Sequence, residues 1–149
     1  MTTLLIAEHN NSDLNDSTLK AATAASQLGA DVHVLVAGSG CASVAEAASK
    51  IAGVSKVLLA DAPALDKMLA EPMAALVTSL GETYTAFVTA SSTNGKNFMP
   101  RIAALLDCSQ ISDVAAILDA NTFERPIYAG NAIQTVSTSE AKKVLTIRT

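Results

Sequence analysis

The sequence has few aromatic residues, few charges and almost no cysteine. Only 3% of its 149 residues are aromatic and none is tryptophan, so we do not expect the stacking platforms that hold single-stranded nucleic acids. Ten basic and 14 acidic side chains give a net charge of −4, with a pI near 5.0. Nucleic-acid-binding proteins usually carry a basic stripe. We therefore expect no nucleic-acid partner.

Disulfides, membrane spans and leader peptides also lack support in the sequence. Cys41 and Cys108 are too few for a disulfide framework, and no apolar run reaches the ~18 residues of a membrane span. The first residues run directly into a strand-like pattern, without the features of a signal or transit peptide. The sequence thus predicts a reduced, soluble protein of bacterial type in the cytoplasm, with no membrane insertion.

Half of the residues are hydrophobic, which is enough for one domain with a proper core. Short apolar segments alternate with alanine-rich amphipathic ones, predicting strands at 3–8, 32–37, 54–60 and 85–90 and helices at 16–28, 43–52, 65–80 and 97–107. Pro72 is expected to split or kink the third helix, and Pro100 to lie in the first turn of the fourth. This pattern predicts an α/β fold of three layers: a mostly parallel sheet with helices on both faces, Rossmann-like or adenine-nucleotide-hydrolase-like.

The last third of the chain has a different pattern. Strands are predicted at 111–118, 122–128, 132–137 and 143–147, with only turns between them. We therefore expect antiparallel strands added to the α/β core. Pro126 indicates that its strand lies at an edge or carries a bulge.

The most polar segment lies between the fourth strand and its helix. It consists of Ser91, Ser92, Thr93, Asn94, Gly95 and Lys96. Hydroxyls, a glycine and a lysine at a helix N-terminus could hold a phosphate, although the glycine spacing of a P-loop is missing. A capped helix start in a solvated loop is the other interpretation, and the sequence leaves both open.

Other candidate sites are weaker. Residues 38–41 resemble the opening of a dinucleotide-binding fingerprint but follow the wrong strand, and Cys41 there has no partner for redox chemistry. Glu8 and Asp61 end strands, and strand-end caps are the favoured role for both. His9 and His33 have no neighbouring ligands, so we expect no metal site and a partly covered, structural His33. We find no catalytic constellation.

Three motifs resemble the electron transfer flavoprotein alpha-subunit family. They are Gly-Lys-x-x-x-Pro-Arg-x-Ala at 95–103, Ile-Ser-Asp at 111–113 and Tyr-Ala-Gly-Asn-Ala at 128–132. The N-terminal half agrees with the family in layout. The resemblance implies that residues 1–149 form a single N-terminal scaffold domain, a piece of an alpha subunit roughly twice as long, and not an enzyme.

In that family, FAD carries electrons from primary dehydrogenases, such as those that act on acyl-CoA in fatty acid beta-oxidation, to a quinone oxidoreductase. FAD is held mainly by a C-terminal domain, so the resemblance places no cofactor-binding, catalytic or metal residue in this chain. It implies a heterodimer with the beta subunit, for which this domain supplies scaffold and interface. The alternative is a free-standing AMP- or ATP-binding module of universal-stress type. That module would use residues 91–96, and Lys96→Ala would weaken its binding of nucleotide.

Overall fold

The computed structural model describes residues 2–29 and 31–149; Met1 and Ala30 lie outside the described part. The helices and strands follow one another along the chain in the order β1 (Thr2–Ile6), α1 (Asp16–Ser26), β2 (Asp31–Gly38), α2 (Ala42–Ser49), β3 (Val54–Asp61), η1 (Pro63–Leu65), α3 (Ala70–Ser79), β4 (Ala86–Ala90), α4 (Thr93–Leu105), β5 (Gln110–Val114), β6 (Ala116–Asp119), β7 (Thr122–Ile127), η2 (Tyr128–Gly130), β8 (Ala132–Ser137) and β9 (Lys143–Ile147). The predicted α/β class is confirmed.

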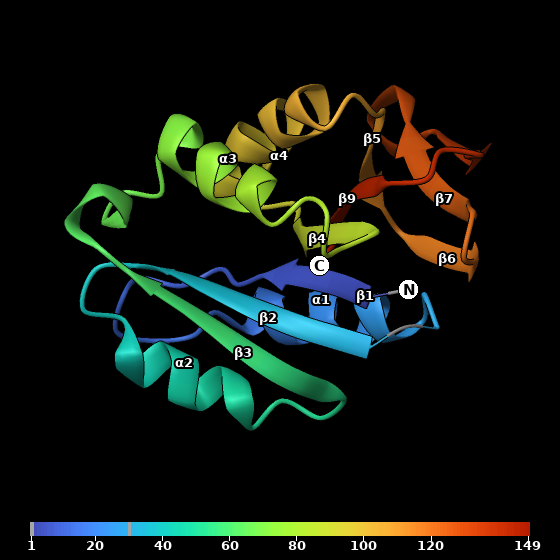
Figure 1. Ribbon diagram of the computed structural model, residues 1–149. Coiled ribbons are helices and arrows are strands. Elements are labelled where there is room, and N and C mark those ends of the chain that lie inside the picture. The colour runs from blue at the N-terminus through green and yellow to red at the C-terminus, as the bar shows by residue number, and fades with distance from the viewer. Residues whose placement is uncertain (1, 30) are drawn as a thin grey trace.

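The main sheet is parallel throughout, with the strand order β3-β2-β1-β4-β9-β5. α1 and α2 cover one face, and α3 and α4 cover the other (Figure 1). Successive side chains of a strand point to opposite faces, so Leu4 packs with the α3 and α4 side while Leu5 packs with the α1 and α2 side. The chain therefore forms three layers.

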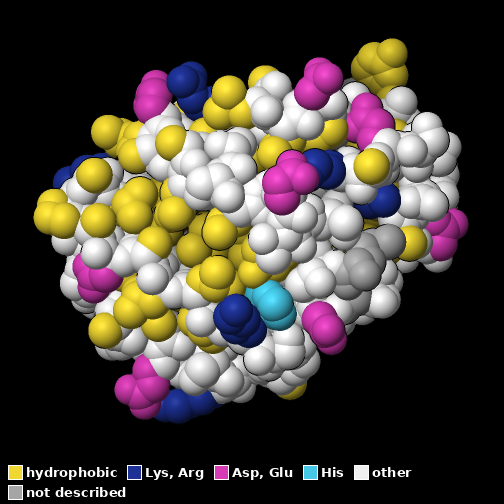
Figure 2. Space-filling view, viewed as in Figure 1, with side chains coloured by type: hydrophobic (Ala, Val, Ile, Leu, Met, Phe, Trp, Pro, Cys, Tyr) yellow, Lys and Arg dark blue, Asp and Glu magenta, His cyan; other side chains and the backbone are white. Residues whose placement is uncertain are grey.

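One part of the α3 side is incompletely covered. Figure 2 shows apolar side chains gathered in the region that Figure 1 places between β3 and α3. We call this region the β3–α3 surface; the partly buried apolar residues that pack against the adjoining core include Leu58 and Ala60 of β3 and Leu76 of α3. Apolar area left open in this way is typical of a contact surface.

The prediction of antiparallel strands in the last third is confirmed in part. Only β6, β7 and β8 form a separate antiparallel sheet, whereas β5 and β9 join the main parallel sheet, with β9 inserted between β4 and β5. Every residue of β9 is buried, with Val144 in the core under α3 and α4 and Leu145 in the other core. A strand that is apolar on both faces is stable only where both faces are covered, which explains its central place. The strand expected at 111–118 is divided between the two sheets.

Pro126 also lies elsewhere than expected, because β7 is the central strand of the small sheet. Its pairing with β6 ends at Glu124, so Pro126 pairs only with Ile133 of β8. The local surroundings are therefore those of an edge, although the strand itself is central. Proline is tolerated there because its missing N–H would face the side that β6 does not reach.

Both predictions about helix prolines were wrong in position. α4 begins at Thr93 rather than at 97, because the Ser92 hydroxyl caps it, and Pro100 consequently lies inside the helix. The segment 65–80 is interrupted near Met68, whose φ is +47°, and Pro72 lies in the first turn of α3. Proline fits a first turn well because the N–H it lacks would have no partner there. The remaining helix and strand boundaries of the α/β core agree with the predicted boundaries within three residues.

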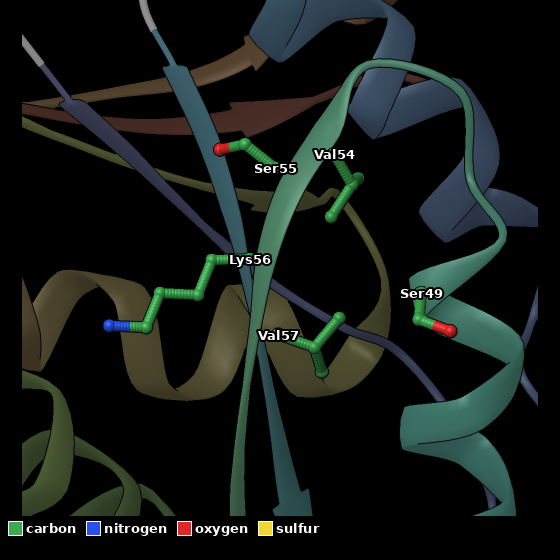
Figure 3. A pocket seen from close by; sticks show the side chains of 5 residues that line it. All are labelled: Ser49, Val54, Ser55, Lys56 and Val57. Atoms are coloured by element: carbon green, nitrogen blue, oxygen red, sulfur yellow. The ribbon is translucent and has the colours of Figure 1, made fainter.

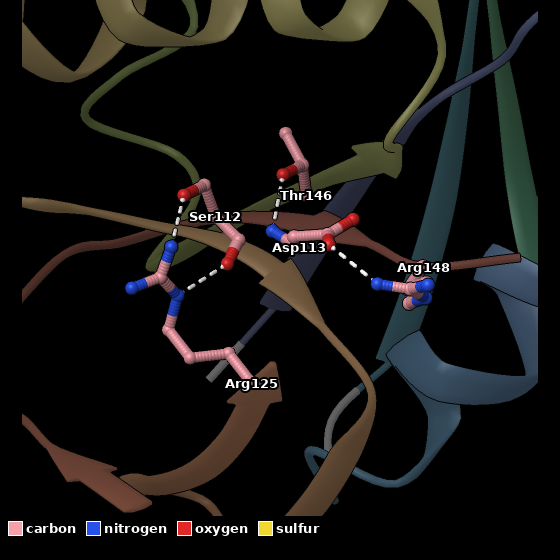
Figure 4. A network of polar contacts seen from close by, with 5 residues as sticks. All are labelled: Ser112, Asp113, Arg125, Thr146 and Arg148. Carbon is pink, nitrogen blue, oxygen red and sulfur yellow. Dashed lines mark hydrogen bonds and ion pairs between the residues drawn. The ribbon is translucent and has the colours of Figure 1, made fainter. Parts of the chain in front are cut away.

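The small sheet is fastened to the main sheet by one buried ring and one guanidinium group. Phe123 of β7 is fully buried in the core under α1 and α2. Arg125 donates from Nε to the Ser112 carbonyl oxygen (2.7 Å) and from a terminal nitrogen to the Ser112 hydroxyl (3.0 Å), as Figure 4 shows. Beside it, Arg148 pairs with Asp113 at 3.1 Å. The small sheet is thus held at a defined place beside β5.

Candidate functional site

The carboxylate of Glu8 lies at the N-terminus of α4. One oxygen accepts a hydrogen bond from the Ser92 hydroxyl at 2.6 Å, and the other accepts one from the Asn94 side-chain amide at 2.9 Å. The Ser92 hydroxyl oxygen in turn accepts from the Gly95 N–H at 3.0 Å. A negative charge is stabilised at this end of a helix by the unpaired N–H groups and the helix dipole. Glu8 therefore occupies the side-chain donors of Ser92 and Asn94 that a phosphate at this helix end would otherwise use.

The backbone of Glu8 is fixed as well. Its N–H donates to the Thr18 hydroxyl oxygen at 2.9 Å, and that hydroxyl donates back to the Glu8 carbonyl oxygen at 3.0 Å. Thr18 is buried in α1, so this exchange joins the end of β1 to α1. The position lies where the order of strands reverses between β1 and β4, the usual place for a ligand in an open α/β sheet.

The polar segment 91–96 is only partly assembled into one site. Ser92, Asn94 and Gly95 gather at Glu8, whereas Thr93 and Lys96 are exposed. The Ser91 N–H donates to the Ile147 carbonyl oxygen at 2.7 Å, which ties the start of the segment to β9. These contacts favour the capped helix start over the phosphate site.

A hollow of about 290 Å³ adjoins Glu8. Its lining includes Glu8, His9 and Asp13, so two acidic side chains face it. Its volume is at the lower limit of typical ligand pockets, about 300–1,000 Å³. The negative lining disfavours a nucleotide phosphate here.

Asn11 joins three loops at the same edge of the sheet, a role that sequence analysis missed. Its side-chain amide donates to Asp66 at both the carboxylate (3.0 Å) and the carbonyl (3.1 Å), and its side-chain oxygen accepts from the Ser39 N–H at 3.1 Å. A Cβ at Gly38 would overlap that oxygen, so a larger residue there would displace the Asn11 side chain from this position. The polar run 10–13 was the only signal in the sequence, and it did not indicate which residue would bridge.

His9 lies beneath this junction and is nearly fully buried. Its Nδ1 accepts a hydrogen bond from the Asn11 N–H at 3.0 Å, which requires the imidazole to be unprotonated at that atom. Burial lowers the pKa of His9 below its ordinary value of 6.5, and the Ala37 carbonyl and the Glu8 charge offset only part of this effect.

This burial predicts a loss of stability in acid. The unfolded chain binds a proton at His9 more readily than the folded protein does, so the free energy of unfolding should fall as the pH drops below about 6.5. His9→Gln should flatten that dependence. Urea unfolding of both proteins at several pH values measures it, and parallel curves for wild type and variant would contradict the prediction.

The remaining sequence candidates have structural roles. Asp61 accepts from the N–H groups of Gly40 (2.8 Å) and Cys41 (3.2 Å) just before α2, which confirms the interpretation of Glu8 and Asp61 as strand-end caps. Burial and the Asp61 charge raise the pKa of the Cys41 thiol. His33 is half-buried and hydrogen-bonded to the Tyr84 hydroxyl at 2.9 Å, as expected for a structural histidine.

A second hollow, of about 140 Å³, lies between α2 and the start of β3. Figure 3 shows Val54 and Val57 pointing toward α2, whereas Lys56 points away from them. Polar groups do not converge on this hollow. Within residues 2–29 and 31–149, no three histidine, cysteine or acidic side chains are placed to share a metal ion, and no helix is long and apolar enough to cross a membrane.

The architecture is that of an open, doubly wound α/β domain, with the Glu8 carboxylate hydrogen-bonded at the N-terminus of α4, at the edge where such domains usually bind ligands. The family model described as "Electron transfer flavoprotein domain" matches residues 3–149. The chain belongs to the electron transfer flavoprotein family.

Similar proteins include the electron transfer flavoprotein alpha subunits of Pseudomonas aeruginosa and Bradyrhizobium diazoefficiens, at 54% and 58% identity over 149 residues. These alignments cover all of this chain and 48% of each relative. The mitochondrial alpha subunit of Dictyostelium discoideum is 49% identical over 156 residues, covering 99% of this chain and 44% of that protein. The chain thus spans about half the length of the curated relatives it matches.

The family name implies a flavin, and the described residues do not fit one. The helix N-terminus that could receive a pyrophosphate is taken by Glu8, and the adjoining hollow is lined by Glu8 and Asp13. A flavin nucleotide would bring further negative charge to this edge. We therefore assign no step of electron transfer to these residues.

Proposed function

We propose that this chain is the scaffold and subunit-interface domain of an electron transfer flavoprotein alpha subunit. The observation that carries this proposal is the family match over residues 3–149, combined with the Glu8 carboxylate hydrogen-bonded at the N-terminus of α4. The whole protein would carry electrons from primary dehydrogenases of the acyl-CoA type to a quinone oxidoreductase, in the cytoplasm. FAD would be held by a region of the alpha subunit that this chain lacks.

The partner of this domain would be the beta subunit of the same flavoprotein. Two features support a contact role: the partly covered β3–α3 surface and the apolar side chains exposed on the small sheet. A closely packed sheet also suits a scaffold, because a densely packed interior has low compressibility and holds the parts attached to it at fixed positions. We do not favour the AMP- or ATP-binding alternative, because Glu8 is hydrogen-bonded to the segment 91–96 that would have to bind the nucleotide phosphate.

Co-expression with the beta subunit tests the proposal. We expect the untagged chain to co-purify with a tagged beta subunit as a one-to-one complex in size-exclusion chromatography with light scattering. The chain purified alone should be colourless. A beta subunit that elutes without the chain, or a chain that retains stoichiometric flavin by itself, would contradict the proposed function.

A further inference from the structure

Asn11 holds three loops together, and the contact that fixes its backbone is made to a histidine. The Asn11 N–H donates to His9 Nδ1, its side-chain amide donates to Asp66, and its side-chain oxygen accepts from the Ser39 N–H. We call these contacts the Asn11 latch. The latch joins the loop after β1 to the loop after β2 and to the segment 62–69, which leads from β3 to α3.

The His9 end of the latch depends on one proton. A neutral imidazole carries its proton on one nitrogen and accepts at the other, so acceptance at Nδ1 places the proton on Nε2. A second proton can bind only at Nδ1, and the ring then has two donors and no acceptor. The Asn11 N–H would face another N–H, and this contact would break. The ring is enclosed at the end of β2, where a Cβ at Gly38 would come within 2.9 Å of His9 Cε1.

The segment 62–69 has few other contacts that fix it to the neighbouring loops. Among the described residues, the bonds from Asn11 to Asp66 are the only side-chain hydrogen bonds that join this segment to another part of the chain. The Ala62 N–H adds one backbone bond, to the Gly38 carbonyl oxygen at 2.9 Å. Asn11 itself has a φ of +72°, a conformation that persists only where surrounding contacts hold it. The position of the segment against the two loops therefore depends on Asn11.

The charged groups around His9 favour protonation once the ring is accessible. In the described part of the chain these are three acids and one lysine: Glu8, Asp13, Asp66 and Lys67. Glu8 and Asp13 line the same hollow as His9, which gives a proton from solvent a short route to the residue. Asp66 lies beyond Asn11 and is paired with Lys67 at 2.8 Å. The end of β2 contributes only the uncharged residues 37 and 38.

We propose that the Asn11 latch is operated by a proton: it is closed while His9 is neutral, and a proton at His9 Nδ1 opens it locally, freeing Ser39 and Asp66 from Asn11. The inference does not depend on the proposed function. Leu65 and Met68 stay buried in the core under α3 and α4, so the opening is a movement of loops at the edge of the sheet and not an unfolding of the domain.

The direction of the switch follows from burial. Burial lowers the pKa of His9 below 6.5 in the closed latch, and opening exposes the ring and restores its ordinary value. Neutral pH therefore favours the closed latch. As the pH falls from about 6.5 toward the pKa of the closed state, the equilibrium constant for opening should rise about tenfold per pH unit, because opening takes up one proton.

An NMR titration of the isotope-labelled chain tests the coupling. Over about pH 5–8, the range in which histidine titrates, the amide signals of Ser39 and Asp66 should shift with the same midpoint as the His9 ring signals. Asn11→Gly keeps the positive φ but lacks the side chain, so the His9 ring should still titrate while the two amides no longer follow it. In the matched control His9→Asn, the side-chain oxygen can accept near the Nδ1 position without binding a proton, and neither amide should shift.

Hydrogen exchange distinguishes this opening from unfolding of the whole domain. The Ser39 N–H donates to Asn11, so its protection, corrected for the intrinsic exchange rate, should fall about tenfold per pH unit below about 6.5. A local opening exposes little surface, so low concentrations of urea should leave Ser39 exchange unchanged and accelerate exchange in β4.

Ser39 and Asp66 signals that follow His9 in the wild type, and not in Asn11→Gly, support the latch. Signals that stay constant while the His9 ring titrates overturn it. Ser39 exchange with the same pH and urea dependence as exchange in β4 also overturns it, because the proton then acts only through unfolding of the domain.

Discussion

Replacing Gly95 with alanine is expected to lower the free energy of unfolding by about 3 kcal/mol, the upper part of the usual range for overpacking. Gly95 lies in the first turn of α4, where the helix approaches the end of β4. A Cβ there would overlap the Ala90 carbonyl oxygen and lie 2.9 Å from a methyl carbon of Thr89. The carbonyl is backbone and cannot turn aside, so the whole helix start must move.

That movement would also disturb the Glu8 contact, because the Gly95 N–H donates to Ser92, which donates to Glu8. At an exposed helix position, alanine normally stabilises a protein relative to glycine by about 0.5–1 kcal/mol. A loss of stability in Gly95→Ala would therefore identify the close approach of α4 to β4 as the cause. Asn97→Ala, at an exposed site on the same helix, is the matched control and should change stability little. Urea unfolding measures both, and a Gly95→Ala protein as stable as wild type would show that α4 does not lie this close to β4.

Phe123→Ala is expected to cost about 4 kcal/mol, within the range for removing a buried phenylalanine ring. The ring is fully buried, and it is the side chain through which β7 enters the core under α1 and α2. Its neighbours Ile117 and Val136 come from β6 and β8, so the cavity would lie where the small sheet meets the main one. The loss of stability should therefore be largest for the small sheet.

Phe123→Leu separates this effect from a general loss of core volume, because leucine keeps most of the contact area, and it should cost less than half as much. Hydrogen exchange should show faster opening of β6–β8 in Phe123→Ala than of β1 and β4. Uniformly faster exchange across both sheets would contradict the assignment of Phe123 as the anchor of the small sheet.

The candidate site illustrates how far local sequence could lead. The polar run 91–96 and the strand-end acid Glu8 were both visible in the sequence, yet they are separated by more than 80 residues. Their hydrogen bonds join positions 84 and 86 residues apart. Spacing along the chain carries no information about such a contact, so the sequence could not distinguish a phosphate site from a helix capped by its own carboxylate.

The strand order shows the same limit. The sequence by itself determined the local elements of the α/β core: apolar periodicity predicted its strands and helices, and three short motifs indicated the family. Only the tertiary structure decided that β9 enters the sheet between β4 and β5, that β7 is central despite Pro126, and that Glu8 closes α4. The physical reason is that periodicity reports which faces of an element need covering. Which distant segment covers them depends on the free energy of packing the whole chain.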